Sequence, residues 1–238
     1  MSYSDANDVL IAVVPVRAGS KGLPGKNIRP LAGMPLYMHA VRQGLRTAGR
    51  VLLTTDIAEI RQDDLPDGCI LCRRPSELAA DDTPIASVIT HLIRSQKLFH
   101  QDILLLQATS PLRTDADVHS AIALFEQGRH DLVMSVVERD RGVLKYGMME
   151  GDRFTGLRNT AYGFQNRQSL PPVYGPNGAV YIFSAARFMA TGGFPSECVG
   201  AFEMPASRSF DIDNEADFQS VEGQMIKERS SAATRIDL

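Results

Sequence analysis

The sequence has few cysteines, and their spacing does not fit a disulfide framework. Cys69, Cys72 and Cys198 are the only cysteines in 238 residues. The first two have the Cys-x-x-Cys spacing of a metal or redox pair, but no second pair is present to complete a zinc site. Because both lie in an apolar stretch that predicts a strand, we expect buried structural thiols.

The sequence also lacks a net positive charge and a long hydrophobic run. Its 25 Lys and Arg residues are outnumbered by 28 Asp and Glu residues, which gives a formal charge of −3. Proteins that bind nucleic acid usually present a basic field, so nucleic acid is not expected as a partner. No apolar run is long enough to cross a bilayer, and the first eight residues are polar and acidic, unlike a signal peptide. We therefore expect a cytoplasmic protein that does not enter a membrane.

The residues that are present suit a globular α/β protein. Hydrophobic residues make up 44% of the chain and charged residues 22%, which is ample for a core. The length fits one large domain or two small ones, and we expect a single domain over residues 1–238. Strand-like apolar runs alternate with helical periodicity, which predicts a three-layer, doubly wound, mainly parallel sheet. Strands are expected at 9–16, 51–56, 68–73, 102–106 and 131–137, and helices at 35–45, 83–93 and 115–127.

A glycine-rich loop at residues 17–27 follows the first expected strand. Its glycines are Gly19, Gly22 and Gly25, and its cations are Arg17, Lys21 and Lys26. Glycines allow the backbone to approach a ligand closely, and the cations bring positive charge to the same short segment. The loop therefore predicts a cradle for a polyphosphate. Its spacing is neither the Walker pattern nor the dinucleotide fingerprint, so a solvated turn with incidental lysines is the alternative.

Two aspartates near the C-terminus form a candidate metal site. In an extended segment, residues two apart face the same side, so Asp211 and Asp213 project together while Ile212 points to the core. Two carboxylates on one face can hold Mg²⁺ together with its waters. The alternative is that Asp213 or Asn214 caps the last helix. Asp56, at the end of the second expected strand, can face a ligand or cap a turn, and we expect the cap.

Residues 138–174 interrupt the α/β alternation. They are richer in charge, glycine and proline than the preceding part, and they lack helical periodicity. We therefore expect an irregular or β-hairpin excursion. Leu144, Tyr146 and Leu157 would be exposed on it, which predicts packing against a second subunit.

The glycine-rich loop resembles the signature Arg-x-x-Ser-Lys-Gly-Leu-Pro-x-Lys-Asn of the cytidylyltransferases that activate acidic sugars, and within them the acylneuraminate (CMP-sialic acid synthetase) branch. The matching residues are Arg17, Ser20, Lys21, Gly22, Leu23, Pro24, Lys26 and Asn27. Similar family blocks occur at 74–81, 105–113, 167–171 and 177–181, with Ala108 as a departure. The resemblance implies a Rossmann-like nucleotidyltransferase fold with a smaller excursion that mediates homodimerisation and reaches the partner's active site.

The resemblance also implies roles for individual residues. It assigns nucleotide binding to Arg17, Ser20, Lys21, Gly22, Lys26 and Asn27, and it implies that Arg74 contacts the nucleotide base. Sugar binding falls on Gln107, Lys145, Arg167, Asn177, Tyr181 and Phe194, and Mg²⁺ binding on Asp211 and Asp213. Lys145 and Arg167 would hold the sugar carboxylate, for which an ammonium and a bidentate guanidinium are suited. Gly175 and Pro195 depart from the arginine and phenylalanine of some sialic-acid enzymes, which leaves the identity of the sugar open.

The function predicted from this pattern is a magnesium-dependent transfer of CMP from CTP to the anomeric hydroxyl of an acidic nonulosonate, with release of pyrophosphate. The acceptor is N-acylneuraminate or a relative such as legionaminate or pseudaminate. Arg17, Lys21, Lys26, Asp211 and Asp213 are the predicted catalytic residues, and no histidine base is required. The alternatives are transfer to 3-deoxy-manno-octulosonate or a phosphonate acceptor, or a catalytically silent nucleotide-binding module, which the intact acidic pair disfavours.

Overall fold

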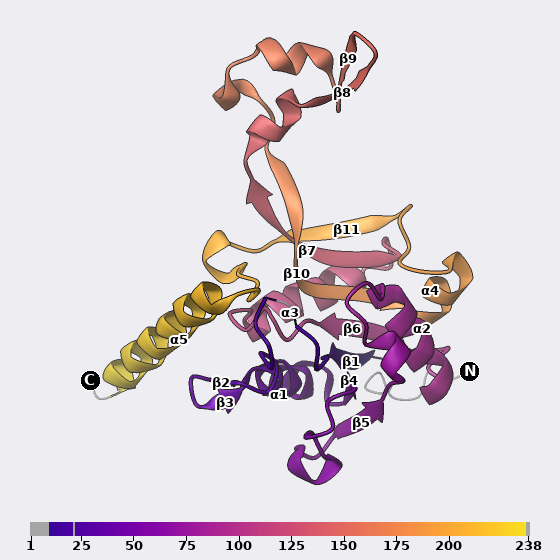
Figure 1. Cartoon of the computed structure of the whole chain (residues 1–238), viewed down its shortest axis with the longest axis vertical. Coiled ribbons are helices and arrows are strands. Elements are labelled where there is room, and N and C mark those ends of the chain that lie inside the picture. Colours follow the sequence, from indigo (N-terminus) through magenta and orange to yellow (C-terminus); the bar gives the residue numbers. More distant parts are fainter. Residues whose placement is uncertain (1–9, 21, 237–238) are drawn as a thin grey trace.

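The computed structural model describes residues 10–20 and 22–236, and its centre is a seven-stranded sheet in the order β11-β7-β10-β6-β1-β4-β5 (Figure 1). The strands are β1 Leu10–Pro15, β4 Val51–Thr55, β5 Cys69–Arg73, β6 Asp102–Leu106, β7 Leu132–Arg139, β10 Val173–Ser184 and β11 Val199–Glu203. All neighbouring strands are parallel except β10, which is antiparallel to both β6 and β7. The predicted mainly parallel sheet is confirmed.

Helices cover both faces of the sheet. On one face lie α1 Leu36–Ala48 and α3 Asp115–Phe125, and on the other lie α2 Ile85–Gln96 and α4 Ala185–Thr191. Strand β1 shows why two layers of helices are needed: Ala12 and Val14 belong to the first core, whereas Ile11 and Val13 belong to the second. Successive side chains of a strand point to opposite faces, so an apolar strand must be covered twice. The predicted three-layer, doubly wound architecture is confirmed.

A third apolar cluster fixes the last helix, α5 Glu215–Ile236, to the loop after β1. Ile212, Phe218 and Val221 pack with Leu23 and Leu31. The loop itself contains a short hairpin of β2 Pro30–Leu31 and β3 Met34–Pro35. Because residues from both ends of the chain share this cluster, the segment before α5 is held beside the glycine-rich loop.

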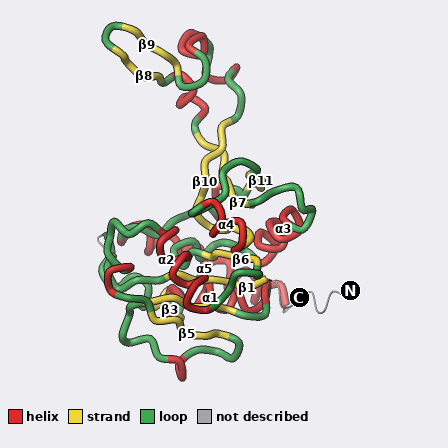
Figure 2. The backbone as a smooth tube through the Cα atoms, turned by 90° about the vertical axis from the view of Figure 1, so that its right-hand side faces the viewer, coloured by secondary structure: helices red, strands yellow, loops and turns green. Residues whose placement is uncertain are grey.

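An arm projects from the sheet between β7 and β10, on a neck formed by these two strands (Figures 1 and 2). It carries the hairpin β8 Gly147–Glu150 and β9 Arg153–Gly156. The described residues also form short 3-10 helices at Gln62–Asp64, Ser76–Leu78, Arg141–Lys145, Thr160–Phe164, Arg167–Ser169 and Ala206–Arg208, of which the third, fourth and fifth lie in the arm. The arm is irregular and hairpin-containing, as its composition predicts.

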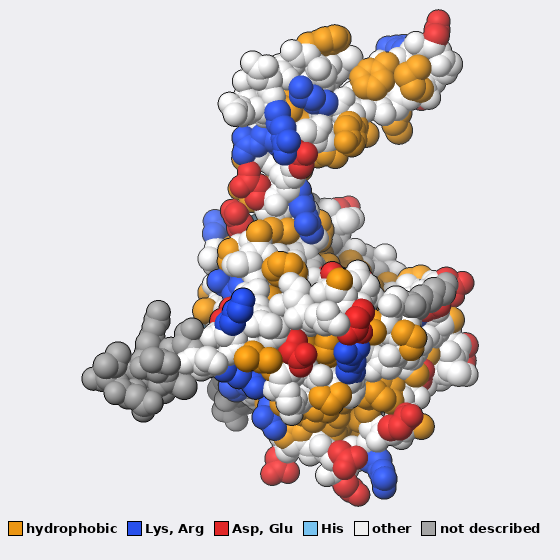
Figure 3. Space-filling model, turned by 60° about the vertical axis from the view of Figure 1, so that its left-hand side comes forward, with side chains coloured by type: hydrophobic (Ala, Val, Ile, Leu, Met, Phe, Trp, Pro, Cys, Tyr) orange, Lys and Arg blue, Asp and Glu red, His pale blue; other side chains and the backbone are white. Residues whose placement is uncertain are grey.

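Hydrophobic side chains are exposed on this arm (Figure 3). They include Tyr146, Met148, Met149, Phe154, Leu157 and Phe164, and the last is 90% exposed. Such a concentration of apolar side chains is typical of a surface that another chain covers. Dimerisation through residues 138–174 stays a prediction.

The three cysteines are free thiols, and Cys69 and Cys72 are buried on β5. Burial raises the pKa of each of these two thiols to about 11, so both remain protonated at neutral pH. They pack as small apolar side chains, as expected. Within the described part of the chain, no helix combines the length and apolar character that a membrane span requires.

Candidate active site

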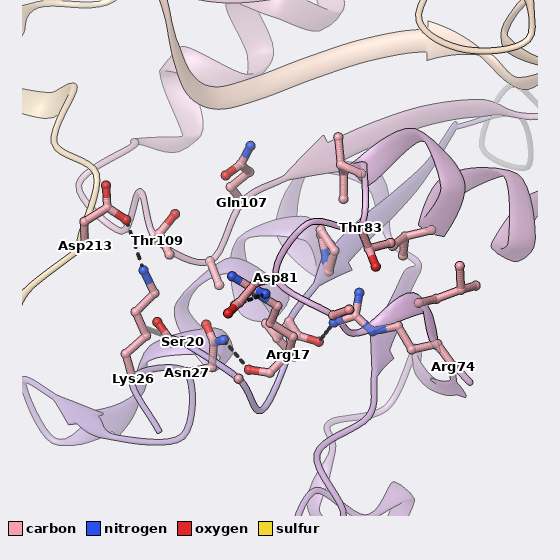
Figure 4. Close-up of a pocket in the computed structure, with 18 of the residues that line it drawn as sticks. Arg17, Ser20, Lys26, Asn27, Arg74, Asp81, Thr83, Gln107, Thr109 and Asp213 are labelled. Carbon is pink, nitrogen blue, oxygen red and sulfur yellow. Dashed lines mark hydrogen bonds and ion pairs between the residues drawn. The ribbon is translucent and has the colours of Figure 1, made fainter. Parts of the chain in front are cut away.

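A cavity of about 290 Å³ lies at the carboxyl ends of β1 and β6 (Figure 4). The chain leaves β1 toward β4 on one side, while β6 pairs with β1 on the other. Ligands bind at such a switch point because the two loops diverge there and leave a crevice. Its lining includes Arg17, Ser20, Lys26, Asn27, Arg74, Asp81, Thr83, Gln107, Thr109, Asp211 and Asp213. The structure thus brings the predicted phosphate loop and the predicted acidic pair to one cavity.

The glycine-rich loop is anchored on both sides of Arg17. The backbone N–H of Ala18 donates to Asp56 Oδ1 at 3.1 Å, and Asn27 Nδ2 donates to the backbone oxygen of Arg17 at 2.8 Å. The Arg17 guanidinium forms an ion pair with Asp81 Oδ1 at 2.6 Å. The loop is therefore ordered by Asp56 at the end of β4, by Asp81 in the turn after β5 and by its own Asn27, and these contacts hold Arg17 at the cavity.

The expectation that Asp56 caps a turn was wrong. Thr55 Oγ1 accepts the hydrogen bond from the backbone N–H of Ile57 at 3.0 Å and so caps the turn. The carboxylate of Asp56 instead faces Ala18 and Arg74. From the end of β4, Asp56 therefore contributes to the site by holding the glycine-rich loop in place.

Lys26 joins the loop to the acidic segment. It is only 8% exposed, and its Nζ donates to the backbone oxygen of Ile212 and, at 3.3 Å, to Asp213 Oδ1. Gly22 makes the close approach possible, because a Cβ at this position would lie 2.1 Å from the backbone oxygen of Asp213. Lys21 lies outside the described residues, so its assignment to the phosphates stays a prediction.

The carboxylates of Asp211 and Asp213 both face the cavity, whereas Ile212 between them is fully buried. Burial raises the pKa of Asp211, and the charge of Asp213 raises it further, while a hydrogen bond with Thr109 and the charge of Lys26 oppose this. The Asp213 side chain is 74% exposed. Two carboxylates with open space in front of them fit a hydrated Mg²⁺ that also contacts substrate phosphates. Among the described residues, no cluster of three or more His, Cys, Asp or Glu side chains is arranged to hold a metal.

The cap of α5 is Asn214 and not Asp213. Asn214 Oδ1 accepts from the backbone N–H of Asp217 at 3.0 Å, and Asp217 Oδ2 accepts from the backbone N–H groups of Asp213 and Asn214. This reciprocal pattern satisfies the first N–H groups of the helix. The Asp213 side chain is therefore not needed for the cap.

Arg74 closes the opposite end of the cavity. It is 8% exposed, donates to the backbone oxygen of Val16, and lies 3.6 Å from Asp56 Oδ1. Burial lowers the pKa of Arg74, and the charge of Asp56 partly restores it. Its Nε is buried without a hydrogen-bond partner in the described part of the chain. A buried donor without a partner beside a cavity marks a place where a ligand acceptor fits.

The predicted sugar-binding residues fall into four places, of which the position of Asn177 is described below. Gln107 lines the cavity. Tyr181 packs against Phe194 with ring centroids 5.9 Å apart, and burial raises the pKa of Tyr181 together with the nearby charge of Asp211. Lys145 and Arg167 lie on the arm, where Arg167 Nε pairs with Asp140 at 2.8 Å. The cavity of a single chain therefore lacks both predicted carboxylate-binding cations.

Asn177, also predicted to bind sugar, is buried and bonded within the protein. Its Oδ1 accepts from Ser135 Oγ and its Nδ2 donates to Ser209 Oγ at 2.9 Å. The side chain thus joins β7, β10 and the segment that leads to Asp211, and it is not part of the cavity lining.

Sequence reasoning missed the anchoring acids Asp56 and Asp81 and the cavity residues Thr83 and Thr109. All four follow strand ends or lie in the 74–83 turn, which is the available signal. Arg113 is a structural residue whose donors go to Gln43 Oε1, the Gln107 backbone oxygen and the Ala179 backbone oxygen.

Comparison with known proteins places the chain among similar sequences and folds. The family model described as cytidylyltransferase matches residues 11–144. An N-acylneuraminate cytidylyltransferase of Streptococcus agalactiae serotype III is 29% identical over 90% of this chain, and the match covers 53% of its own length. The chain thus spans about half the length of this curated relative.

Two further proteins are similar over nearly their whole length. The CMP-N,N'-diacetyllegionaminic acid synthase of Legionella pneumophila is 31% identical, and the match covers 91% of this chain and 96% of that protein. A solved structure of CMP:2-keto-3-deoxy-manno-octonic acid synthetase complexed with CTP superimposes with a TM-score of 0.68 at 16% identity, covering 92% of this chain and 99% of that one. At this identity the likeness shows a shared fold.

Proposed function

This chain belongs to the cytidylyltransferase family, and we propose that it transfers CMP from CTP to the anomeric hydroxyl of an acidic nonulosonate sugar, releasing pyrophosphate. The observation that carries the proposal is the meeting of the phosphate loop and the Asp211–Asp213 pair at one cavity, with Lys26 between them. A module that only binds a nucleotide has no need of two carboxylates beside its phosphate site.

In the proposed reaction, the anomeric hydroxyl gives up its proton to solvent water, and its oxygen forms a bond to the α-phosphorus of CTP. The bond from this phosphorus to the bridging oxygen breaks, and its electron pair leaves with pyrophosphate. Arg17 and Lys26 would offset the negative charge on the α-phosphate, and Lys21 with the loop amides would hold the β- and γ-phosphates. Because Arg17 and Lys26 are already held by Asp81 and Ile212, little reorganisation is needed when CTP binds.

We propose Mg²⁺ as the divalent ion, a class of cofactor that this family generally uses. Asp211 and Asp213 would hold it, since both face the cavity and Asp213 is not needed as a helix cap. When bound, the ion makes a coordinated hydroxyl easier to deprotonate and neutralises phosphate charge. Arg74, with its buried Nε, would contact the base of CTP.

The acceptor class follows from the relatives and from the arm. The relatives named above act, by their names, on N-acylneuraminate and on diacetyllegionaminate, which are both acidic nonulosonates. We propose that Lys145 and Arg167 bind the sugar carboxylate from the arm of a second subunit in a homodimer, while Gln107, Tyr181 and Phe194 line the sugar side. CTP as a substrate supports a cytoplasmic location.

The test is a pyrophosphate-release assay that pairs N-acetylneuraminate, legionaminate, pseudaminate and 3-deoxy-manno-octulosonate with each of the four nucleotides. We expect release with CTP and a nonulosonate, dependent on magnesium. Preference for the octulosonate would select the alternative acceptor. CTP binding without pyrophosphate release from any acceptor would contradict the proposal and favour the silent module.

A further inference from the structure

A second cavity, of about 320 Å³, lies between α1 and α5 and is strongly cationic. Arg42 and Arg46 enter it from α1, Arg229 from α5, and Arg113 from the loop before α3, together with His39. In Figure 1, α1 and α5 lie next to each other at the lower left of the body. The lining shares no residue with the cavity at the ends of β1 and β6.

Three of the four arginines form no ion pair with a carboxylate within the described part of the chain. Arg46 is the exception, since it binds Asp115 through two bonds of 2.6 and 2.9 Å. Arg113 is 4% exposed, and its hydrogen bonds go to an amide and two carbonyl oxygens. Arg229 donates to the backbone oxygen of Ala32 at 2.7 Å, and none of the ion pairs between described residues includes Arg42.

The nearby carboxylates already accept hydrogen bonds from other groups of the chain. Asp115 is bound by Arg46 and Gln43, and Asp117 is bound by Arg208 through two hydrogen bonds. Glu222, on α5, accepts from the backbone N–H of Ala32 at 2.9 Å. Asp115 thus offsets the charge of Arg46, while Arg42 and Arg229 form no ion pair with a described carboxylate, so the cavity keeps an excess of guanidinium groups.

The field of this cavity acts on His39. Burial lowers the pKa of His39, and the charges of Arg229 and Arg42 lower it further. Its Nε2 lies 2.9 Å from the backbone oxygen of Leu31. The lowered pKa favours the neutral imidazole, so His39 contributes a polar side chain to the cavity lining, and the positive charge comes from the arginines.

We propose that this cavity is a second anion site, for a phosphate-class ligand such as pyrophosphate, and that its occupancy lowers turnover at the CTP cavity. The planar guanidinium fork matches phosphate oxygens, and the exposed guanidinium groups of Arg42 and Arg229 have no carboxylate partner among the described residues. The volume suits a small phosphate compound. Pyrophosphate is the anion that the proposed reaction itself releases.

Arg113 connects the two cavities. Its NH1 donates to the backbone oxygens of Gln107 and Ala179, and Gln107 lines the CTP cavity. An anion that attracts the Arg113 guanidinium weakens these two bonds and so loosens the strand end that carries Gln107 and Thr109. Because binding effects are reciprocal, occupancy of one cavity then changes the properties of the other.

The binding test uses inorganic pyrophosphate and calorimetry at constant ionic strength, without magnesium. Arg17→Gln protein, in which the CTP cavity is weakened, is compared with the same protein carrying Arg42→Gln and Arg229→Gln. We expect the added pair to weaken the remaining pyrophosphate site by about tenfold or more, since charge-assisted bonds are lost. Adding Arg50→Gln and Arg94→Gln, two exposed arginines elsewhere, is the charge-matched control and leaves the affinity unchanged. Equal affinity in all three proteins would overturn the proposal.

The coupling test rests on the proposed function and measures pyrophosphate inhibition at fixed free magnesium. In the otherwise unmodified protein, we expect pyrophosphate to lower kcat by roughly fivefold even at saturating CTP, a typical size for allosteric coupling. In Arg42→Gln/Arg229→Gln protein, saturating CTP removes the inhibition. Purely competitive inhibition in both proteins would refute the coupling. A protein that releases no pyrophosphate from CTP fails as a cytidylyltransferase, whereas the calorimetric result stands independently.

Discussion

Gly22 and Lys26 set the distance between the phosphate loop and the acidic segment. The Lys26 ammonium binds the backbone of Ile212, and the absence of a side chain at Gly22 leaves room for the Asp213 carbonyl. The Lys26 hydrogen bond holds the acidic segment against the loop, and the missing side chain at Gly22 leaves room for this contact. Of the three loop glycines, Gly22 is thus the one whose size matters most for the site.

We predict that Gly22→Ala lowers turnover on the order of a hundredfold, because a Cβ there displaces the Asp211–Asp213 segment, and misplacement by about 1 Å has effects of that size. The matched control is Gly19→Ala, since a Cβ at Gly19 meets no atom within 4 Å. Pyrophosphate release and thermal melting should be measured for both variants. Equal activity in the two would show that the close approach is not needed.

The acidic pair gives a second prediction at this scale. Asp211→Asn and Asp213→Asn should each lower turnover much more than CTP affinity, because the loop cations still hold the triphosphate. Pyrophosphate release against magnesium concentration, with CTP binding measured separately, provides the test. Asn214→Ala is the control: it removes the cap of α5 and lowers stability by about 1 kcal/mol, but it leaves the magnesium dependence unchanged. Normal magnesium dependence in both Asn variants would refute the metal assignment.

At the scale of elements, β7 and β10 do two things. Within the sheet they pair with each other and are covered by helices. Beyond the irregularity between Pro176 and Tyr181, the same two strands continue as the neck of the arm. The neck pairs Val173 with Arg139 and Tyr174 with Glu138. Within the described residues the 3-10 helices of the arm pack on each other and on β9, yet several apolar side chains of the arm stay exposed unless another subunit covers them.

We predict that the protein is a homodimer through this arm. Light scattering at micromolar concentration should show a dimer, and Tyr146→Glu/Leu157→Glu should give monomers with weakened sugar binding, since Lys145 and Arg167 then no longer reach a partner's cavity. The control is Phe99→Glu/Ile226→Glu, which places the same charges on exposed apolar positions of the body. A fully active monomer would contradict the assembly.

At the scale of the whole molecule, ion pairs connect segments that are distant in sequence. Arg208, just before the acidic pair, binds Asp117 at the start of α3 through bonds of 3.0 and 2.7 Å. Burial raises the pKa of Asp117, but Arg208 and Thr114 outweigh it and hold the pKa below its usual value. The folded protein therefore favours the ionised carboxylate.

This shift predicts how stability depends on pH. The contribution of Asp117 is complete above its unfolded pKa of about 3.9 and is lost as the pH falls through the lower folded value. Urea unfolding at pH 5 and pH 3 should therefore show a smaller loss of stability on acidification in Arg208→Gln than in the unmodified protein. Arg187→Gln, which removes an exposed pair with Asp131, should keep the original difference. An unchanged difference in Arg208→Gln would refute the prediction.

Short-range patterns in the sequence predict the features that depend on neighbouring residues. The alternating strands and helices, the glycine-rich loop and the shared face of Asp211 and Asp213 all follow from periodicity and local backbone freedom. Those features were predictable because strand and helix periods, and the conformations open to glycine, act over a few residues.

Which distant groups meet depends on how the folded chain packs. In the folded chain, β10 lies antiparallel between β6 and β7. Asp56 binds the glycine-rich loop, Thr55 caps the turn that follows β4, and Asn214 caps α5. Folding also brings Arg42 and Arg229 to one cavity. Each of these depends on how helices and strand ends pack across the sheet, and a pattern within one segment holds no information about which charge another segment will place beside it.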